Sequence, residues 1–95
     1  MPQKPKHKPN NLDIYRRRMR FSQKQVAHLL GYKDNSAWSK YERRERLPSL
    51  ANALKLAIIL RVPVEFLFHS LHDELHDQIL TEEERLAQPA QQPLF

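Results

Sequence analysis

The sequence predicts an all-α protein with a single compact domain. Among the 95 residues there are seven prolines but only one glycine, whereas an all-β chain needs many glycine-bearing turns. The residues between Leu12 and Leu86 are mostly good helix formers. A chain of this length has room for one hydrophobic core. We therefore expect short helices that share one core.

Positive charge is concentrated in the first half of the chain. Residues 1–46 carry 13 Lys or Arg and 4 Asp or Glu, whereas residues 47–95 carry 3 and 7. This asymmetry suggests a polyanionic partner for the first half, although a solvated basic face is an equally simple interpretation.

Several classes of protein are disfavoured by the composition. The chain has no cysteine, which excludes disulfides, thiolate metal sites and a cysteine nucleophile. The N-terminus is lysine-rich without an apolar run, and the longest apolar stretch, 56–60, is too short to cross a bilayer. No nucleophile–base set or glycine-rich phosphate loop is present, so we expect no enzyme activity and no cofactor. We expect a cytoplasmic protein without a membrane partner.

The first two helices are predicted from their caps and apolar spacing. The first runs from about Leu12 to Arg20, with Asn11 as N-cap and with Leu12, Tyr15 and Met19 on one face. The second runs from about Gln23 to Leu30, begins at the N-cap Ser22 and ends at Gly31, where glycine suits a left-handed cap. Its buried side is predicted to hold Val26, Ala27, Leu29 and Leu30.

The third and fourth helices follow two short connections. The third runs from about Asn35 to Arg43 and is capped by Asp34 or Asn35. Trp38 is expected to be a core residue and not an exposed aromatic platform for stacking. The fourth runs from about Leu50 to Leu60, capped by Ser49. Its buried face is predicted to hold Leu50, Leu54, Ala57 and Ile58.

The remaining segments flank this domain. A fifth helix begins at Val64 and continues to about Leu80, and Thr81 with Glu84 forms a capping box for a short last helix to Ala87. We thus expect a disordered basic arm at 1–10, a domain at 11–68, a helical extension at 69–87 and a flexible tail at 88–95. The lysines of the arm are suited to contact phosphates, or else to act as a solubilising tail.

Two short helices joined by a glycine-containing turn are typical of a helix-turn-helix. Ala27 is small where the two helices must approach, and Gly31 supplies the turn. Asn35, Ser36 and Lys40 are predicted to share the outward face of the third helix, where they can read bases in the major groove. Gln23, at the start of the second helix, and the basic Lys24 and Lys33 are expected to contact phosphates.

The order of motifs resembles the phage Cro/repressor-like (Xre) family of bacterial regulators. The matching pieces are S-Q-x-x-x-A-x-x-x-G at 22–31, S-K-Y-E at 39–42, L-P-S at 47–49 and L-x-V-x-V-E-x-L at 60–67. The resemblance covers about residues 12–68. It implies a five-helix lambda-repressor-like DNA-binding domain, here with a C-terminal helical extension.

The resemblance also assigns roles to individual residues. Gln23 corresponds to a phosphate-contacting glutamine, and Asn35, Ser36 and Lys40 occupy the base-reading positions. Arg16 and Glu42 match a pair in which an arginine of the first helix bonds a glutamate of the third. The loop after the third helix, which meets the DNA backbone in the family, carries Arg43, Arg44 and Arg46.

The chain departs from the family pattern at four places. Arg20, Arg44 and Arg61 stand where the family often has glycine, so a different helix cap is expected at each. The turn before the third helix is one residue longer than usual. The first base-reading residue is therefore Asp34, Asn35 or Ser36.

Two patterns lie in the C-terminal extension. His69, His72 and His76 have a spacing that can bind zinc, but the residue after His72 is Asp73 instead of the Glu of a metallopeptidase, and we expect no metal site. An apolar stripe extends beyond the five-helix core and is expected to form a dimer interface, or else to pack on the core; it comprises Phe68, Leu71, Leu75 and Ile79.

The sequence therefore predicts a homodimeric, sequence-specific regulator, most simply a repressor, that binds a palindromic operator in double-stranded DNA. One alternative is an antitoxin that caps a toxin protein through the acidic C-terminal segment and also represses its own operon. Another is a protein-interaction module that has lost DNA binding, against which the basic first half argues.

Overall fold

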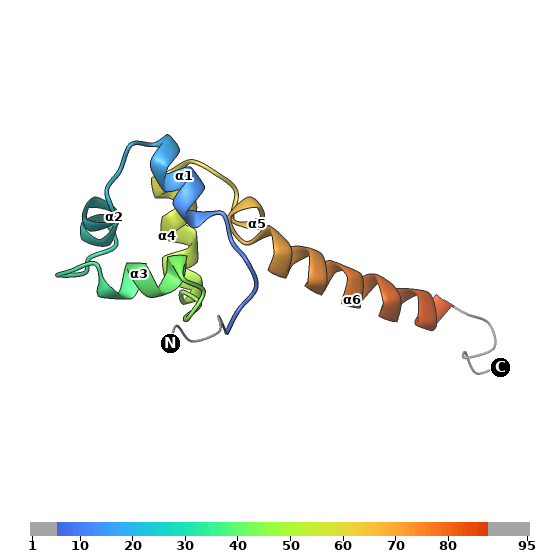
Figure 1. Ribbon diagram of the computed structural model, residues 1–95. Helices are drawn as coiled ribbons and strands as arrows, with labels where there is room; N and C mark the ends of the chain where they lie inside the picture. The colour runs from blue at the N-terminus through green and yellow to red at the C-terminus, as the bar shows by residue number, and fades with distance from the viewer. Residues whose placement is uncertain (1–5, 88–95) are drawn as a thin grey trace.

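The computed structural model describes residues 6–87 and is all-helical over that range (Figure 1). The predicted flexible tail at 88–95 and residues 1–5 of the predicted arm lie outside the described residues. The helices are α1 (Leu12–Arg18), α2 (Gln23–Leu29), α3 (Ser36–Glu42), α4 (Leu50–Leu60), α5 (Val64–Leu67) and α6 (His69–Ala87).

The first five helices enclose one apolar core, and α6 projects away from it (Figure 1). Trp38 is fully buried at the centre, as the sequence predicted, and its ring meets Tyr41 edge-on with centroids 6.3 Å apart. Ala27 is also buried, so that α2 can pack closely against α3. The buried set comprises Leu12, Val26, Ala27, Leu30, Trp38, Tyr41, Leu56, Leu60 and Leu67.

The first four helices end in the same way, although only one of them ends at glycine. After α2, Gly31 has φ +92°, and the N–H groups of Gly31 and Tyr32 donate to the carbonyls of His28 and Ala27. This is a Schellman motif, which satisfies carbonyls left free at a helix end. The left-handed residues after α1, α3 and α4 are Arg20 (φ +61°), Arg44 (φ +64°) and Arg61 (φ +60°).

The expectation that these three arginines would end their helices differently from glycine is wrong. Each adopts the conformation that glycine adopts most easily, and the N–H that follows it bonds back into the helix: Phe21 to Arg16, Glu45 to Lys40 and Val62 to Ala57. A side chain in this conformation costs roughly 1–2 kcal/mol. The positive charge at a helix C-terminus offsets part of that cost.

The predicted N-cap residues Asn11, Ser22 and Ser49 are confirmed, although among these three only the serine side chains cap their helices. Ser22 and Ser49 each accept a hydrogen bond from the backbone N–H three residues later. The side chain of Asn11 makes no cap bond; its amide donates to the carbonyl of Phe66, 3.0 Å away, and so joins α1 to α5. The Leu12 N–H is instead taken by the Asn10 side chain, at 3.1 Å.

The buried face of α4 differs from the predicted one. Leu50 and Ile58 are each 76 % exposed and Leu54 is half exposed, while Leu56 and Leu60 fill the core. Apolar residues surround this helix on most sides, so its periodicity does not single out one face. A smaller error of the same kind concerns Leu29, which is half exposed on α2.

The predicted fifth helix is interrupted, and the break determines where α6 points. Phe68 has φ −123° and ψ 49°, which ends α5 after one turn. α6 then runs without interruption to Ala87, so Thr81 lies inside a helix and the predicted capping box at Thr81 and Glu84 is wrong. No glycine or proline occurs between 69 and 87, and nothing in that segment stops the helix. Within residues 6–87, no helix combines the length and the hydropathy needed to cross a membrane.

The described part of the basic arm differs from the predicted disorder. The N–H groups of Lys6 and His7 both donate to the carbonyl of Arg44, at 3.2 and 3.1 Å. The Asn10 amide donates to the carbonyl of Tyr41, near the end of α3. Residues 6–10 are therefore attached to the α3–α4 loop.

We expect that replacing Arg61 by glycine stabilises the protein. Arg61→Gly removes the left-handed strain but also a favourable charge at the end of α4, so the free energy of unfolding should rise by about 0.5–1 kcal/mol. Urea denaturation followed by circular dichroism measures the change. Arg61→Ala is the control, because it removes the same charge and keeps the strain; a rise of equal size in Arg61→Ala would contradict this account.

Candidate nucleic-acid interface

One carboxylate joins the first three helices. Glu42, near the end of α3, accepts a hydrogen bond of 2.7 Å from the Arg16 Nε of α1. Its second oxygen accepts from the Gln23 amide of α2. Arg16 also donates to the carbonyl of Phe21, in the α1–α2 turn, at 3.0 Å. The predicted Arg16–Glu42 pair therefore forms, and it includes Gln23.

Gln23 extends this network to the start of α3. Its Oε1 lies 3.3 Å from the Asn35 amide and 3.5 Å from the Ser39 hydroxyl. Both polar ends of the Gln23 side chain thus have partners within the protein. Ser39 was not among the predicted site residues, although the S-K-Y-E motif contains it.

The beginning of α3 is held by Asp34. Its Oδ1 accepts from the Ser36 N–H at 2.9 Å and from the Ser36 hydroxyl at 2.6 Å, whereas the Asn35 side chain makes no cap bond. The hydroxyl bond, and then the backbone bond, hold the pKa of Asp34 below its usual value. The carboxylate is therefore negative at neutral pH, which suits a helix N-terminus and disfavours contact with phosphate.

The two faces of α3 are clearly different. Trp38 and Tyr41 are buried, while Ser36 and Lys40 are exposed. Asn35, just before the helix, is half-buried against Gln23. Of the three predicted base-reading residues, Ser36 and Lys40 thus lie open on the outer face of α3, and Asn35 lies partly covered at its start.

A chain of hydroxyls, which the sequence did not suggest, fixes α3 against α4. The Tyr32 and Tyr41 hydroxyls are 2.8 Å apart, and the Asn52 amide of α4 donates to Tyr32 at 2.7 Å. The bond with Tyr41, followed by burial, raises the pKa of Tyr32. Three polar residues spaced along the chain carry no local pattern, so only folding brings them together.

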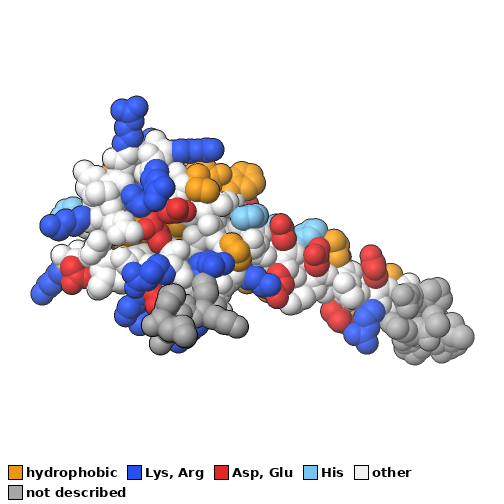
Figure 2. Space-filling view, viewed as in Figure 1, with side chains coloured by type: hydrophobic (Ala, Val, Ile, Leu, Met, Phe, Trp, Pro, Cys, Tyr) orange, Lys and Arg blue, Asp and Glu red, His pale blue; other side chains and the backbone are white. Residues whose placement is uncertain are grey.

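The predicted phosphate-binding residues lie in two groups. Lys24 and Lys33 line one hollow beside α2. Arg43, Arg44 and Arg46 lie in the α3–α4 loop, where Arg43 is paired with Glu45 at 2.6 Å and Arg44 holds the arm. Figure 2 shows Lys and Arg side chains distributed over the globular body and acidic side chains along α6.

This geometry is that of a helix-turn-helix: two short helices, a glycine turn and an outward polar face on the second. A family model described as helix-turn-helix, of the Cro/C1 type, matches residues 12–67, which is more than half of the chain. The chain belongs to the Cro/C1-type (Xre-like) helix-turn-helix family. A comparison with curated proteins gives no significant match.

Family membership gives the general function. Cro/C1-type proteins bind DNA and regulate transcription, so this chain is a DNA-binding transcription regulator. The family is generally a regulatory one without enzyme activity. The matched range ends at residue 67, so α6 lies beyond it.

The three histidines of the extension do not converge. His69 Nδ1 lies 3.1 Å from the amide of Asn11, the N-cap of α1, whereas the His72 and His76 rings stack on each other with centroids 5.9 Å apart. Within residues 6–87 no group of three His, Cys, Asp or Glu side chains is arranged to hold a metal ion.

We expect that loss of the Glu42 carboxylate destabilises the whole domain. Glu42→Ala leaves the Arg16 guanidinium and the Gln23 amide without their shared partner, at a cost of about 3 kcal/mol in the free energy of unfolding. Glu45→Ala is the matched control, because its pair with Arg43 is exposed and such pairs contribute about 0–1 kcal/mol. Thermal unfolding of both variants measures the difference; equal losses would show that Glu42 has no special role.

Proposed function

We propose that the protein is a cytoplasmic, sequence-specific repressor that binds an inverted repeat in double-stranded DNA as a homodimer. The observation that supports this most directly is the Glu42 network, which joins α1, α2 and α3 and leaves Ser36 and Lys40 exposed on α3. A rigidly held helix with an open polar face is suited to enter a major groove.

Base reading is assigned to the outer face of α3. Lys40 can donate to the acceptors of guanine, and Ser36 can bond either kind of base edge. Asn35 can pair with adenine once its amide leaves Gln23, from which it is separated by a long bond of 3.3 Å. Asp34 is occupied as a cap, so readout begins at Asn35 or Ser36.

Phosphate contacts are assigned to the two basic groups that flank α3. Gln23 already donates one amide hydrogen to Glu42, and its second amide hydrogen would be offered to a phosphate at the start of α2. Binding through these residues releases counterions, so affinity should fall steeply with salt. The set comprises Gln23, Lys24, Lys33, Arg43, Arg44 and Arg46.

Dimerisation is assigned to the apolar stripe of the extension. Leu75 and Ile79 are 49 % and 59 % exposed, and Phe68 and Leu71 are partly covered at the base of α6. A two-fold dimer would match an operator with two-fold symmetry.

An antitoxin is the second candidate function. α6 carries six acidic residues and one arginine, projects from the body and buries none of its side chains. Such a helix is able to cover a basic partner protein while the body binds DNA.

The proposed function predicts the outcome of an in vitro selection from random duplex DNA. The purified protein, at near-physiological salt, should enrich an inverted repeat whose half-sites lie about one helical turn apart, roughly 10 base pairs. Retention of DNA without enrichment of any sequence would reject sequence-specific regulation and favour a partner-dependent protein.

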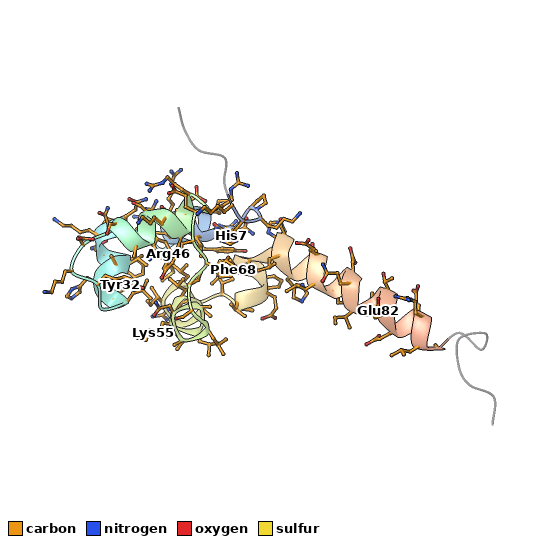
Figure 3. All side chains as sticks on the ribbon, turned by 90° about the horizontal axis from the view of Figure 1, so that it is seen from below. His7, Tyr32, Arg46, Lys55, Phe68 and Glu82 are labelled. Carbon is orange, nitrogen blue, oxygen red and sulfur yellow. The ribbon has the colours of Figure 1, made fainter. Side chains whose placement is uncertain are left out.

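Replacement of Lys40 should relax the choice of one base. With the selected operator, Lys40→Ala should reduce discrimination at one position of each half-site by about 1–3 kcal/mol. Lys55→Ala is the control, because Figure 3 shows Lys55 on the opposite side of the body from α3. Fluorescence anisotropy on operators with single substitutions measures both variants. An equal loss on all sequences would make Lys40 a phosphate contact.

A further inference from the structure

α6 lacks the packing that a helix in water requires. All 19 residues of this helix are described, and none is buried. Helices of this length are marginal alone and normally depend on tertiary packing of an apolar face. The stripe of Leu71, Leu75 and Ile79 provides such a face, because its members are spaced four positions apart.

An apolar groove continues this stripe onto the body. Phe68, which precedes α6, and Leu71 and Leu75 of the first part of α6 form one wall. The opposite wall comes from the α3–α4 loop, α4 and α5, and its apolar residues are Leu47, Pro48, Leu50, Ala53 and Val64. The stripe and the groove share Leu71 and Leu75 and therefore form one apolar surface.

The charges around this surface indicate what covers it. Lys6 and Lys8 lie at the base of α6, where they line a hollow with Phe68, Leu71 and Glu74. Figure 3 shows His7 of the arm close to Phe68. The far half of α6 is acidic, with Glu82, Glu83 and Glu84 in succession. Within one chain Lys8 lies 4.0 Å from Glu74, and Glu82 lies 3.0 Å from Arg85. Both pairs are exposed and such pairs contribute little, so the lysines of the arm can exchange Glu74 for the acidic tip of α6 from another copy.

We propose that α6 pairs antiparallel with α6 of a second copy, around a two-fold axis that passes beside Leu75. This arrangement sets Leu71 against Ile79 of the partner subunit, and the reverse. Glu82 of the partner subunit then lies beside Phe68, within the reach of Lys6 and Lys8. The tip of each α6 enters the groove of the other copy.

A parallel pair of α6 helices would fit neither the charges at the two ends of the helix nor the groove on the body. It would align the acidic tips of the two helices, and like charges side by side are unfavourable. It would also leave the groove without a helix to fill it. In the antiparallel pair the two Phe68 residues lie about 21 Å apart along the helix axis, since a helix rises 1.5 Å per residue. The two bodies therefore lie at opposite ends of the helix pair.

This inference deepens the dimeric regulator proposed above, and protein without DNA is sufficient to test it. Light scattering after size-exclusion chromatography should give a dimer at high micromolar concentration. Ile79→Glu places a charge in the apolar contact and should weaken dimerisation by at least about 30-fold. Leu80→Glu is the matched control: Leu80 neighbours Ile79 but lies outside the stripe, so this variant should stay dimeric. Circular dichroism verifies that both variants remain folded.

Engineered cysteines determine the orientation of the helices. The chain has no cysteine, so each introduced thiol is unique. A mixture of Leu71→Cys and a size-tagged Ile79→Cys should oxidise to a mixed disulfide, whereas each variant alone should cross-link poorly. Efficient cross-linking of each variant with itself would indicate a parallel pair and overturn the proposal.

Two further results would also overturn it. One is that the wild-type protein stays monomeric at high micromolar concentration, even if it associates with a different small protein. The other is an equal loss of dimer in Ile79→Glu and Leu80→Glu. A monomer that still selects a DNA sequence would reject this interface and leave DNA recognition intact, so the two proposals can fail separately.

Discussion

The carboxylate of Glu42 is the interaction on which the placement of the recognition helix depends. Its two oxygens accept from Arg16 on α1 and from Gln23 on α2, so one group of α3 fixes two other helices at once. The side chains of Arg16 and Glu42 are only 12 % and 8 % exposed, which makes the pair strong only while every partner is present. The same network reaches Asn35 and Ser39, and it therefore couples the core of the domain to the residues that would meet DNA.

The helix ends show how charge and backbone geometry compete. A Schellman ending favours glycine because a side chain in the left-handed region is strained. This chain keeps the ending after α1, α3 and α4 but places arginine there each time. Stability is lost, and three cations are gained near helix C-termini. Arg44 has an additional structural role, because its carbonyl accepts two N–H groups of the N-terminal arm and so places the lysines of the arm beside the basic loop.

The body and the extension differ in how far they bury their apolar side chains. The body buries nine apolar residues in one core, Trp38 among them. On α6, Leu75 and Ile79 are exposed, and the apolar stripe to which they belong continues into a groove on the body. The lysines of the arm lie beside the base of that helix and its tip is acidic, which is why we propose a second copy as the partner of the extension.

The sequence by itself determined the helical class, the turn at Gly31, the caps at Ser22 and Ser49, the burial of Trp38 and the Arg16–Glu42 pair. Each of these rests on a local rule or on a motif with fixed spacing. The structure alone decided which face of α4 is buried, because a helix that is apolar on most sides has no preferred face until its neighbours pack against it. It likewise decided the break at Phe68, the hydrogen bond from Gln23 to Glu42 and the chain of hydrogen bonds through Tyr32, Tyr41 and Asn52. These features join residues far apart in sequence, and no local pattern records such contacts.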